Sequence, residues 1–261
     1  MSPVRTATRL VWPVLGLVGL WAVLVTPLSP LALSRGDVAL GQGDAGKAVR
    51  VYDRVADWCV LASTRRRALE RSAAVYASEL NDPDQARRRW SALLVHIDDA
   101  QARARVHHRI AEQWMATRHP EQAARSWEAA YQDDPEYAEY LALSGRALVL
   151  AGRPRRALAT WSRVVREHPE WRAEANLARA QVHLSRGSVN EALPLFEDAA
   201  AHGDPEVAAV ARLGSATCLE RMGSLDEALA ALDLADLPQD VYRRRSDAIQ
   251  ARVVWSGEPS Q

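Results

Sequence analysis

The amino-acid sequence predicts an all-α fold made of repeated helix pairs, preceded by a membrane-spanning helix. One alanine recurs in a fixed setting at nearly constant intervals, and the apolar residues between its copies keep helical rather than alternating spacing. An uncharged apolar stretch near the N-terminus predicts the spanning helix. With 48% hydrophobic residues the chain is too apolar to be disordered, and its 33 basic and 33 acidic side chains argue against a nucleic-acid binder.

The N-terminal segment is interpreted as a signal-anchor helix. Residues 10–26 carry no charge, and the uncharged stretch continues to residue 33, which is long enough to cross roughly 30 Å of hydrocarbon. We assign residues 1–9 to a short cytoplasmic N-terminus and residues 10–28 to the transmembrane helix. A cleaved signal peptide and a buried helix are the alternatives. Prolines crowd the exit of the stretch, and no clear small-x-small cleavage site follows it.

The charges on either side of this stretch predict its orientation. Arg5 and Arg9 precede it with no acidic residue among the first nine, whereas Arg35 is followed by Asp37 and Asp44. Basic residues stay preferentially on the cytoplasmic side. We therefore expect a cytoplasmic N-terminus and an exported remainder.

Residues 29–240 are predicted to form six repeats. In each repeat a turn and a polar pair precede an alanine, and a large apolar side chain follows four residues later. Successive alanines lie 34 to 38 residues apart, a period typical of stacked helix pairs. The six pairs of anchoring residues are Ala48 with Tyr52, Ala86 with Trp90, Ala123 with Trp127, Ala157 with Trp161, Ala192 with Phe196, and Ala228 with Leu232.

A second small residue stands twelve positions before each anchoring alanine. Only Gly or Ala lets two helices cross closely, so these positions are predicted helix–helix contacts. They are Gly36, Ala74, Ala111, Gly145, Ala180 and Ala216. Gly and Pro residues between the two helices of most pairs indicate turns, since Pro favours the start of a helix and Gly its end.

In these features the chain resembles the tetratricopeptide repeat family. That repeat has two antiparallel helices, with a small residue in the first, an alanine and an aromatic residue in the second, and a closing proline, here Pro135 and Pro169. The resemblance implies a right-handed superhelical α-solenoid that binds a protein or peptide on its concave side. Residues 241–261 are then a capping helix, Val241 to Trp255, and a tail.

The resemblance also implies a partner-binding groove, which the first helix of each repeat lines through fixed positions. Arginines concentrate there in repeats 2 to 4, which favours a ligand with acidic groups. The lysine and asparagine pattern by which the family grips a terminal carboxylate is absent at these places. The candidate groove residues, with the neighbouring Arg109 included, are Arg71, Arg105, His108, Arg109, Glu112, Glu139, Arg146, Glu174 and Gln181.

The glycine-rich stretch Gly41–Lys47 is the strongest candidate for enzyme chemistry. It is similar to a phosphate-binding loop, but Ala48 stands where such a loop needs a hydroxyl residue, and no strand precedes it. We interpret it as the turn between two helices. A nucleotide-binding enzyme is kept as an alternative, while the favoured prediction is a non-enzymatic protein without a cofactor.

No metal site or disulfide is predicted. His107, His108 and Glu112 supply too few converging ligands for a metal. Cys59 and Cys218 fall in distant repeats, which predicts two free thiols. Arginine clusters such as 87–89 are interpreted as solvated helix faces.

The expected function is that of a membrane-anchored scaffold for protein–protein interaction. The chain resembles bacterial anchored tetratricopeptide proteins, which implies a place on the periplasmic face of the inner membrane in envelope assembly or quality control. The same scaffold facing the cytoplasm is the alternative. We expect a protein or peptide partner in the groove, a membrane contact through residues 10–28, and no nucleic acid.

Overall fold

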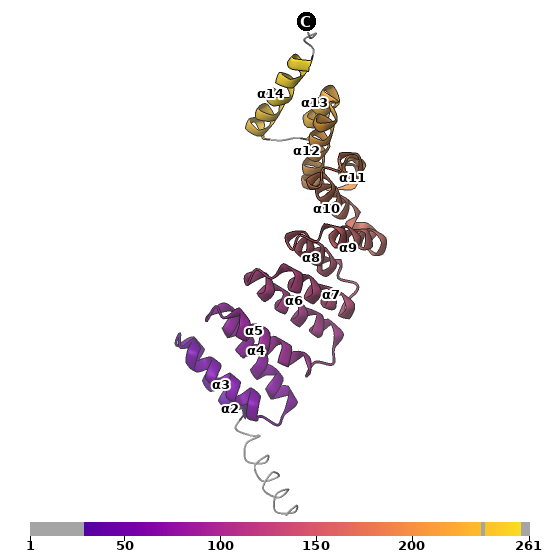
Figure 1. Ribbon diagram of the computed structural model, residues 1–261. Coiled ribbons are helices and arrows are strands. Elements are labelled where there is room, and N and C mark those ends of the chain that lie inside the picture. The colour runs from indigo at the N-terminus through magenta and orange to yellow at the C-terminus, as the bar shows by residue number, and fades with distance from the viewer. Residues whose placement is uncertain (1–28, 236–237, 257–261) are drawn as a thin grey trace, which may run out of the picture. The chain divides into compact units, whose positions relative to one another are not determined.

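The computed structural model describes residues 29–235 and 238–256, and this part of the chain is all-α (Figure 1). It contains thirteen α-helices, one short 3-10 helix and no strand. The predicted segments 1–9 and 10–28 lie outside these residues. Among the described helices, none combines the length and the apolar character needed to cross a membrane.

The chain divides into two compact units, up to Asp134 and from Pro135. Unit 1 holds three helix pairs: α2 (Ser29–Gly41) with α3 (Ala45–Trp58), α4 (Ala62–Ser78) with α5 (Pro83–Leu94), and α6 (Ala100–Ala116) with α7 (Pro120–Asp133). Unit 2 holds α8 (Ala138–Leu150) with α9 (Pro154–Glu167), the 3-10 helix η2 (Pro169–Trp171), α10 (Arg172–Ser185) with α11 (Val189–His202), α12 (Pro205–Met222) with α13 (Leu225–Asp233), and α14 (Gln239–Ser256). The predicted all-α array of helix pairs is therefore confirmed, and its superhelical sense stays a prediction.

The anchoring alanines are buried in the contact between the two helices of each pair, as predicted. All six have no exposed surface, and the large side chain four residues later is buried in every repeat. Alanine at this place lets the two helices approach, and the large side chain fills the space beside it. The hydrophobic seam of the array therefore follows the recurring pair of residues in the sequence.

Five of the six predicted small contacts are buried, and the sixth prediction is wrong. A Cβ added to Gly36 would overlap the ring of Tyr52, and one added to Gly145 would lie 2.7 Å from the indole of Trp161. Ala74, in contrast, is exposed, and its neighbour Ala73 is fully buried in its place.

A longer turn in repeat 2 explains this shift. In the other repeats the amide after the left-handed turn residue donates to a carbonyl five residues back, as in the bond from Arg153 N to Leu148 O. In repeat 2, Asp82 N donates to Tyr76 O, six residues back. One extra residue therefore separates α4 from α5, and the position twelve before Ala86 falls on the wrong face of α4.

Each turn within a helix pair contains one residue with positive φ, always five before the anchoring alanine. Glycine, which has no Cβ to clash there, fills four of these places: Gly43, Gly152, Gly187 and Gly223. Repeat 2 uses Asn81, and repeat 3 uses Arg118 at φ 59°. Arg118 therefore holds a strained conformation that most side chains avoid.

Buried polar groups join the helices of unit 1. Asp53 on α3 accepts hydrogen bonds from Ser72 and Tyr76 on α4 and from Arg89 on α5. Its carboxylate thus connects three consecutive helices. These hydrogen bonds offset the free-energy cost of removing the carboxylate from water.

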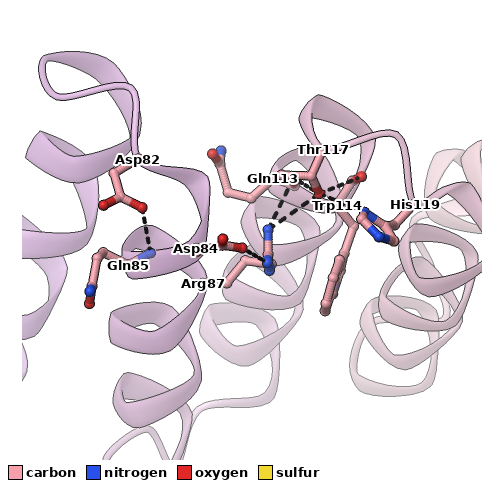
Figure 2. A network of polar contacts seen from close by, with 8 residues as sticks. All are labelled: Asp82, Asp84, Gln85, Arg87, Gln113, Trp114, Thr117 and His119. Atoms are coloured by element: carbon pink, nitrogen blue, oxygen red, sulfur yellow. Dashed lines mark hydrogen bonds and ion pairs between the residues drawn. The ribbon is translucent and has the colours of Figure 1, made fainter.

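The prediction that the arginine run 87–89 forms a solvated helix face is wrong, because two of its three side chains contact neighbouring helices. Figure 2 shows Arg87 reaching from α5 toward the end of α6, where its guanidinium lies 3.8 Å from the ring centroid of Trp114. The same group donates to Thr117 Oγ1 and to the carbonyl of Gln113. Its side chain is 13% exposed, and Arg89 is half-buried beside Asp53. Of the three arginines, only Arg88 is largely exposed to solvent.

The last helix, α14, packs on the sixth pair. Ile249 is buried in a cluster with Leu219 of α12 and with Ala228 and Leu232 of α13. The helix begins at Gln239 and ends at Ser256, slightly beyond the predicted limits on both sides.

Candidate partner-binding surfaces

Unit 2 contains a pocket that brings together three of the predicted groove residues. Arg146 of α8 and Glu174 and Gln181 of α10 all line it, around a volume of about 560 Å³. Trp161 of α9 and Val207 of α12 complete its wall. The remaining lining residues are mostly apolar: Val149, Leu150, Leu177, Ala178, Val182 and Ser185.

Two polar groups in this pocket have no partner among the described residues. The indole of Trp161 is 1% exposed, and its Nε1–H is buried without an acceptor. Glu174 Oε2 is likewise buried without a donor. Buried polar groups are nearly always hydrogen-bonded in folded proteins. The surface that the pocket presents is mainly apolar, with Arg146, Glu174 and Gln181 as its charged and amide side chains.

Unit 1 contains a second, more polar pocket of about 410 Å³. The predicted residues Arg105 and Arg109 of α6 line it, together with Arg66 and Glu70 of α4. Its apolar wall comes from Trp90, Leu93, Ile97 and Val106. As in unit 2, the indole N–H of the Trp on the second helix is buried without an acceptor among the described residues.

His108 and Glu112 are engaged with their own helix pair. Trp127 Nε1 donates to His108 Nδ1 at 2.9 Å, so the imidazole carries its proton on Nε2, which lies 3.4 Å from Glu112 Oε1. Hydrogen bonding by His108 holds the pKa of Glu112 below its usual range. These two side chains are therefore less available to a partner than the groove prediction assumed.

The neighbouring His107 is turned toward α7. Its Nε2 lies 3.7 Å from Asp133 Oδ2. Burial lowers the pKa of this imidazole, although the charge of Asp133 opposes the shift. Within the described part of the chain, no group of three or more His, Cys, Asp or Glu side chains is arranged to hold a metal ion.

Arg71 and Glu139 are both paired within their units. Arg71 on α4 binds Asp37 on α2 at 2.6 Å, and Glu139 accepts a hydrogen bond from Tyr137 at 2.5 Å. The turn in repeat 2 is one residue longer than in repeat 3. Glu70, and not Arg71, is therefore the residue of α4 that is structurally equivalent to His108 of α6. This register shift explains why the sequence pattern missed Glu70.

The glycine stretch Gly41–Lys47 forms the turn between α2 and α3. Asp44 accepts a hydrogen bond from the amide of Lys47, Gly43 has φ 79°, and Ala48 is fully buried in the helix pair. An amide that already caps the helix in this way does not point toward a phosphate. Cys59 and Cys218 are free thiols, as predicted, and both are buried.

The sequence pattern missed most of the apolar pocket wall. Val149 and Leu150 end α8 with exposed side chains, and Leu177 lies on α10 opposite them. A large apolar residue exposed at the end of a helix is the available signal, but a single exposed apolar residue is common on protein surfaces.

Comparison with known proteins agrees with this fold. Two family models match the chain, and both are described as tetratricopeptide repeat. The first matches residues 115–170 and 144–208, and the second matches residues 183–252. Together the matches span just over half of the chain, so the chain belongs to the tetratricopeptide repeat family. No curated protein sequence matches the chain.

Solved structures share the fold at low sequence identity. MamA residues 41 to the end from Desulfovibrio magneticus RS-1 is 22% identical over 57% of this chain and 84% of that one, with a TM-score of 0.50. A second MamA structure is 17% identical over 67% of this chain and 91% of that one, with a TM-score of 0.50. YrrB, described as a TPR protein with an unusual peptide-binding site, is 21% identical over 64% and 83%, with a TM-score of 0.48.

Proposed function

We propose that this protein is a membrane-anchored scaffold that holds a partner protein through the pocket of unit 2. The tetratricopeptide fold makes the chain a protein-interaction scaffold. The observation that carries the finer proposal is the convergence of Arg146, Glu174 and Gln181 on one mainly apolar pocket. An apolar side chain of the partner fills the pocket, while the side chains of Arg146 and Gln181 bind polar groups of the partner.

The membrane anchor is supported by the uncharged residues 10–28, and the orientation by Arg5 and Arg9 before them. This arrangement puts the repeats on the periplasmic side of a bacterial inner membrane. An exported scaffold near the membrane surface is suited to envelope assembly or quality control. A compartment-sensitive reporter fused to the C-terminus tests the orientation, and activity of a cytoplasm-specific reporter there would favour the cytoplasmic alternative.

The pocket is tested by photo-crosslinking in native membranes. A photoreactive residue replaces Gln181 in the pocket, and a matched one replaces Arg155, which is exposed on α9 outside it. We expect a discrete crosslinked protein from position 181 that disappears when Leu177→Arg blocks the pocket, with its fold checked by circular dichroism. Equal crosslinking from both positions, or a product that survives Leu177→Arg, would exclude the pocket as the binding site.

A further inference from the structure

Unit 1 has an apolar edge on the side where successive helix pairs are joined and where α2 begins. Five exposed apolar side chains form this edge: Leu31 at the start of α2, Trp58, Val60 and Leu61 between α3 and α4, and Val95 after α5. Trp58 is 62% exposed and Val95 is 82% exposed. From Trp58 to Ser63 the chain carries no charge.

Contacts between the helices place these five residues at one level. The ring of Tyr52 packs against Gly36 and its hydroxyl binds Asp37, so α2 and α3 are antiparallel and the start of α2 lies beside the end of α3. Arg71 also binds Asp37, which aligns the start of α4 with that of α2. The bond from Arg89 to Asp53 likewise aligns the end of α5 with that of α3.

The opposite edge of unit 1 has a different character. It consists of the turns within the helix pairs, residues 42–44, 79–82 and 117–119. These turns contain mostly polar residues and glycine, and Leu80 is the exposed large apolar side chain among them. The edge between the helix pairs also carries the exposed Asp57, Asp98 and Asp99, so its apolar part is confined to the five side chains named above. This apolar part differs in polarity from the turn edge and continues in sequence into residues 10–28.

From this juxtaposition we propose that the apolar edge rests on the lipid bilayer and seats unit 1 against the membrane surface. The inference depends on the proposed anchor, because a spanning helix that ends at residue 28 leaves the start of α2 at the bilayer surface. Trp favours the membrane–water interface, and Val and Leu side chains gain by leaving water there. Arg66 and Arg67 are exposed one turn into α4, next to the edge, where they meet anionic headgroups.

Fluorescence quenching in proteoliposomes tests this contact on the full chain. Cys59 and Cys218 are first replaced by Ala, and a single environment-sensitive probe is attached after Val60→Cys on the apolar edge or Gln42→Cys on the turn edge. The vesicles contain phosphatidylcholine, phosphatidylglycerol and a lipid with a nitroxide near its headgroup. We expect the nitroxide to quench the probe at position 60 at least threefold more than the probe at position 42.

Three further results separate the possible failures. If the chain does not float with the vesicles after alkaline carbonate extraction, the anchor itself is wrong and the edge contact falls with it. If the chain floats but the two positions are quenched equally, the edge proposal alone is overturned. If the probe at position 60 is shielded from aqueous iodide yet not quenched by the nitroxide, a protein covers the edge and the lipid contact is likewise excluded.

A second set of variants tests whether the apolar side chains themselves, and not only the anchor at residues 10–28, hold the apolar edge against the bilayer. The probe is placed at Val95→Cys, and Trp58, Val60 and Leu61 are changed together to Ser. These side chains are exposed, so the fold should persist, as circular dichroism would verify. We expect nitroxide quenching at position 95 to fall at least twofold, with Leu80→Ser on the turn edge as a control without effect. Unchanged quenching in the triple variant would overturn the proposal.

Discussion

Repeats 3 and 4 share their anchors but differ in what surrounds them. In repeat 3 the indole of Trp127 donates to His108, which stands fifteen residues before Ala123. In repeat 4 the corresponding place is Ala142, and Trp161 Nε1 has no acceptor among the described residues. With a methyl group in place of the imidazole, the indole N–H of repeat 4 loses the acceptor that repeat 3 provides, and Trp161 itself lines the pocket of unit 2.

The two repeats also differ at the small contact position on the first helix. Repeat 3 has Ala111 there, whereas repeat 4 has Gly145, and the ring of Trp161 occupies the space that a Cβ would need. The tryptophan of repeat 4 thus packs directly against the backbone of its partner helix at Gly145. The same sequence pattern accommodates both arrangements, because the pattern requires only that the residue be small.

The largest expected effect comes from Gly145→Val. The added side chain would overlap the ring of Trp161, which is 1% exposed, and overpacking a rigid core should lower the free energy of unfolding by about 3 kcal/mol. Ala111→Gly in repeat 3 should cost about 1 kcal/mol through backbone entropy. Urea unfolding followed by circular dichroism measures both. Gly41→Ala is the control, since nothing lies within 4 Å of its added Cβ. Wild-type stability of Gly145→Val would contradict the close contact.

The second prediction concerns the indole hydrogen bond. Trp127→Phe and Trp161→Phe remove the same amount of side chain, but only the first breaks a bond and leaves His108 Nδ1 without its donor. We expect Trp127→Phe to lower the free energy of unfolding by about 1 kcal/mol more than Trp161→Phe. Equal losses in urea unfolding would show that the imidazole contact contributes nothing measurable.

Repeat 1 extends the comparison to alkaline pH, because Tyr52 fills the place of these tryptophans. Burial, and then the hydrogen bond to Asp37, raise the pKa of Tyr52 to about 12. Between pH 10 and 12 the folded chain keeps a proton that the unfolded chain has lost, so stability falls as the pH rises. At pH 11 this loss should reach about 1.4 kcal/mol relative to neutral pH. Tyr52→Phe should show a correspondingly smaller loss, and identical pH profiles of the two proteins would refute the assignment.

The last prediction concerns the turns of the two repeats. Arg118 and Gly152 occupy the same left-handed place in repeats 3 and 4. Arg118→Gly should raise the free energy of unfolding by up to about 1 kcal/mol because it relieves backbone strain, and Gly152→Ala should lower it by a similar amount. Thermal unfolding gives both signs. A change of the same sign in both variants would mean that another contact of these residues dominates.

Much of the fold was predictable because it depends on local, periodic chemistry. The anchoring alanines, the large residues four positions later and the Gly and Pro turns each act within one helix pair, and all recur in the sequence. The Ala74 prediction failed because the turn before Asn81 is one residue longer than in the other repeats. Counting twelve residues back from Ala86 therefore reaches Ala74 instead of the buried Ala73, and both residues are small enough to satisfy the pattern. Two adjacent alanines give no sequence signal that separates them.

The candidate site was predictable only in part. The sequence by itself determined that Arg146, Glu174 and Gln181 would share the face formed by first helices, because their positions repeat. Only the tertiary structure decided that His108 accepts a hydrogen bond from Trp127 and that Arg71 forms an ion pair with Asp37. It also decided that Val149, Leu150 and Leu177 line one pocket. The physical reason is that periodicity fixes the face of a helix on which a residue lies. Pairing and packing with another helix decide whether that side chain stays available to a partner.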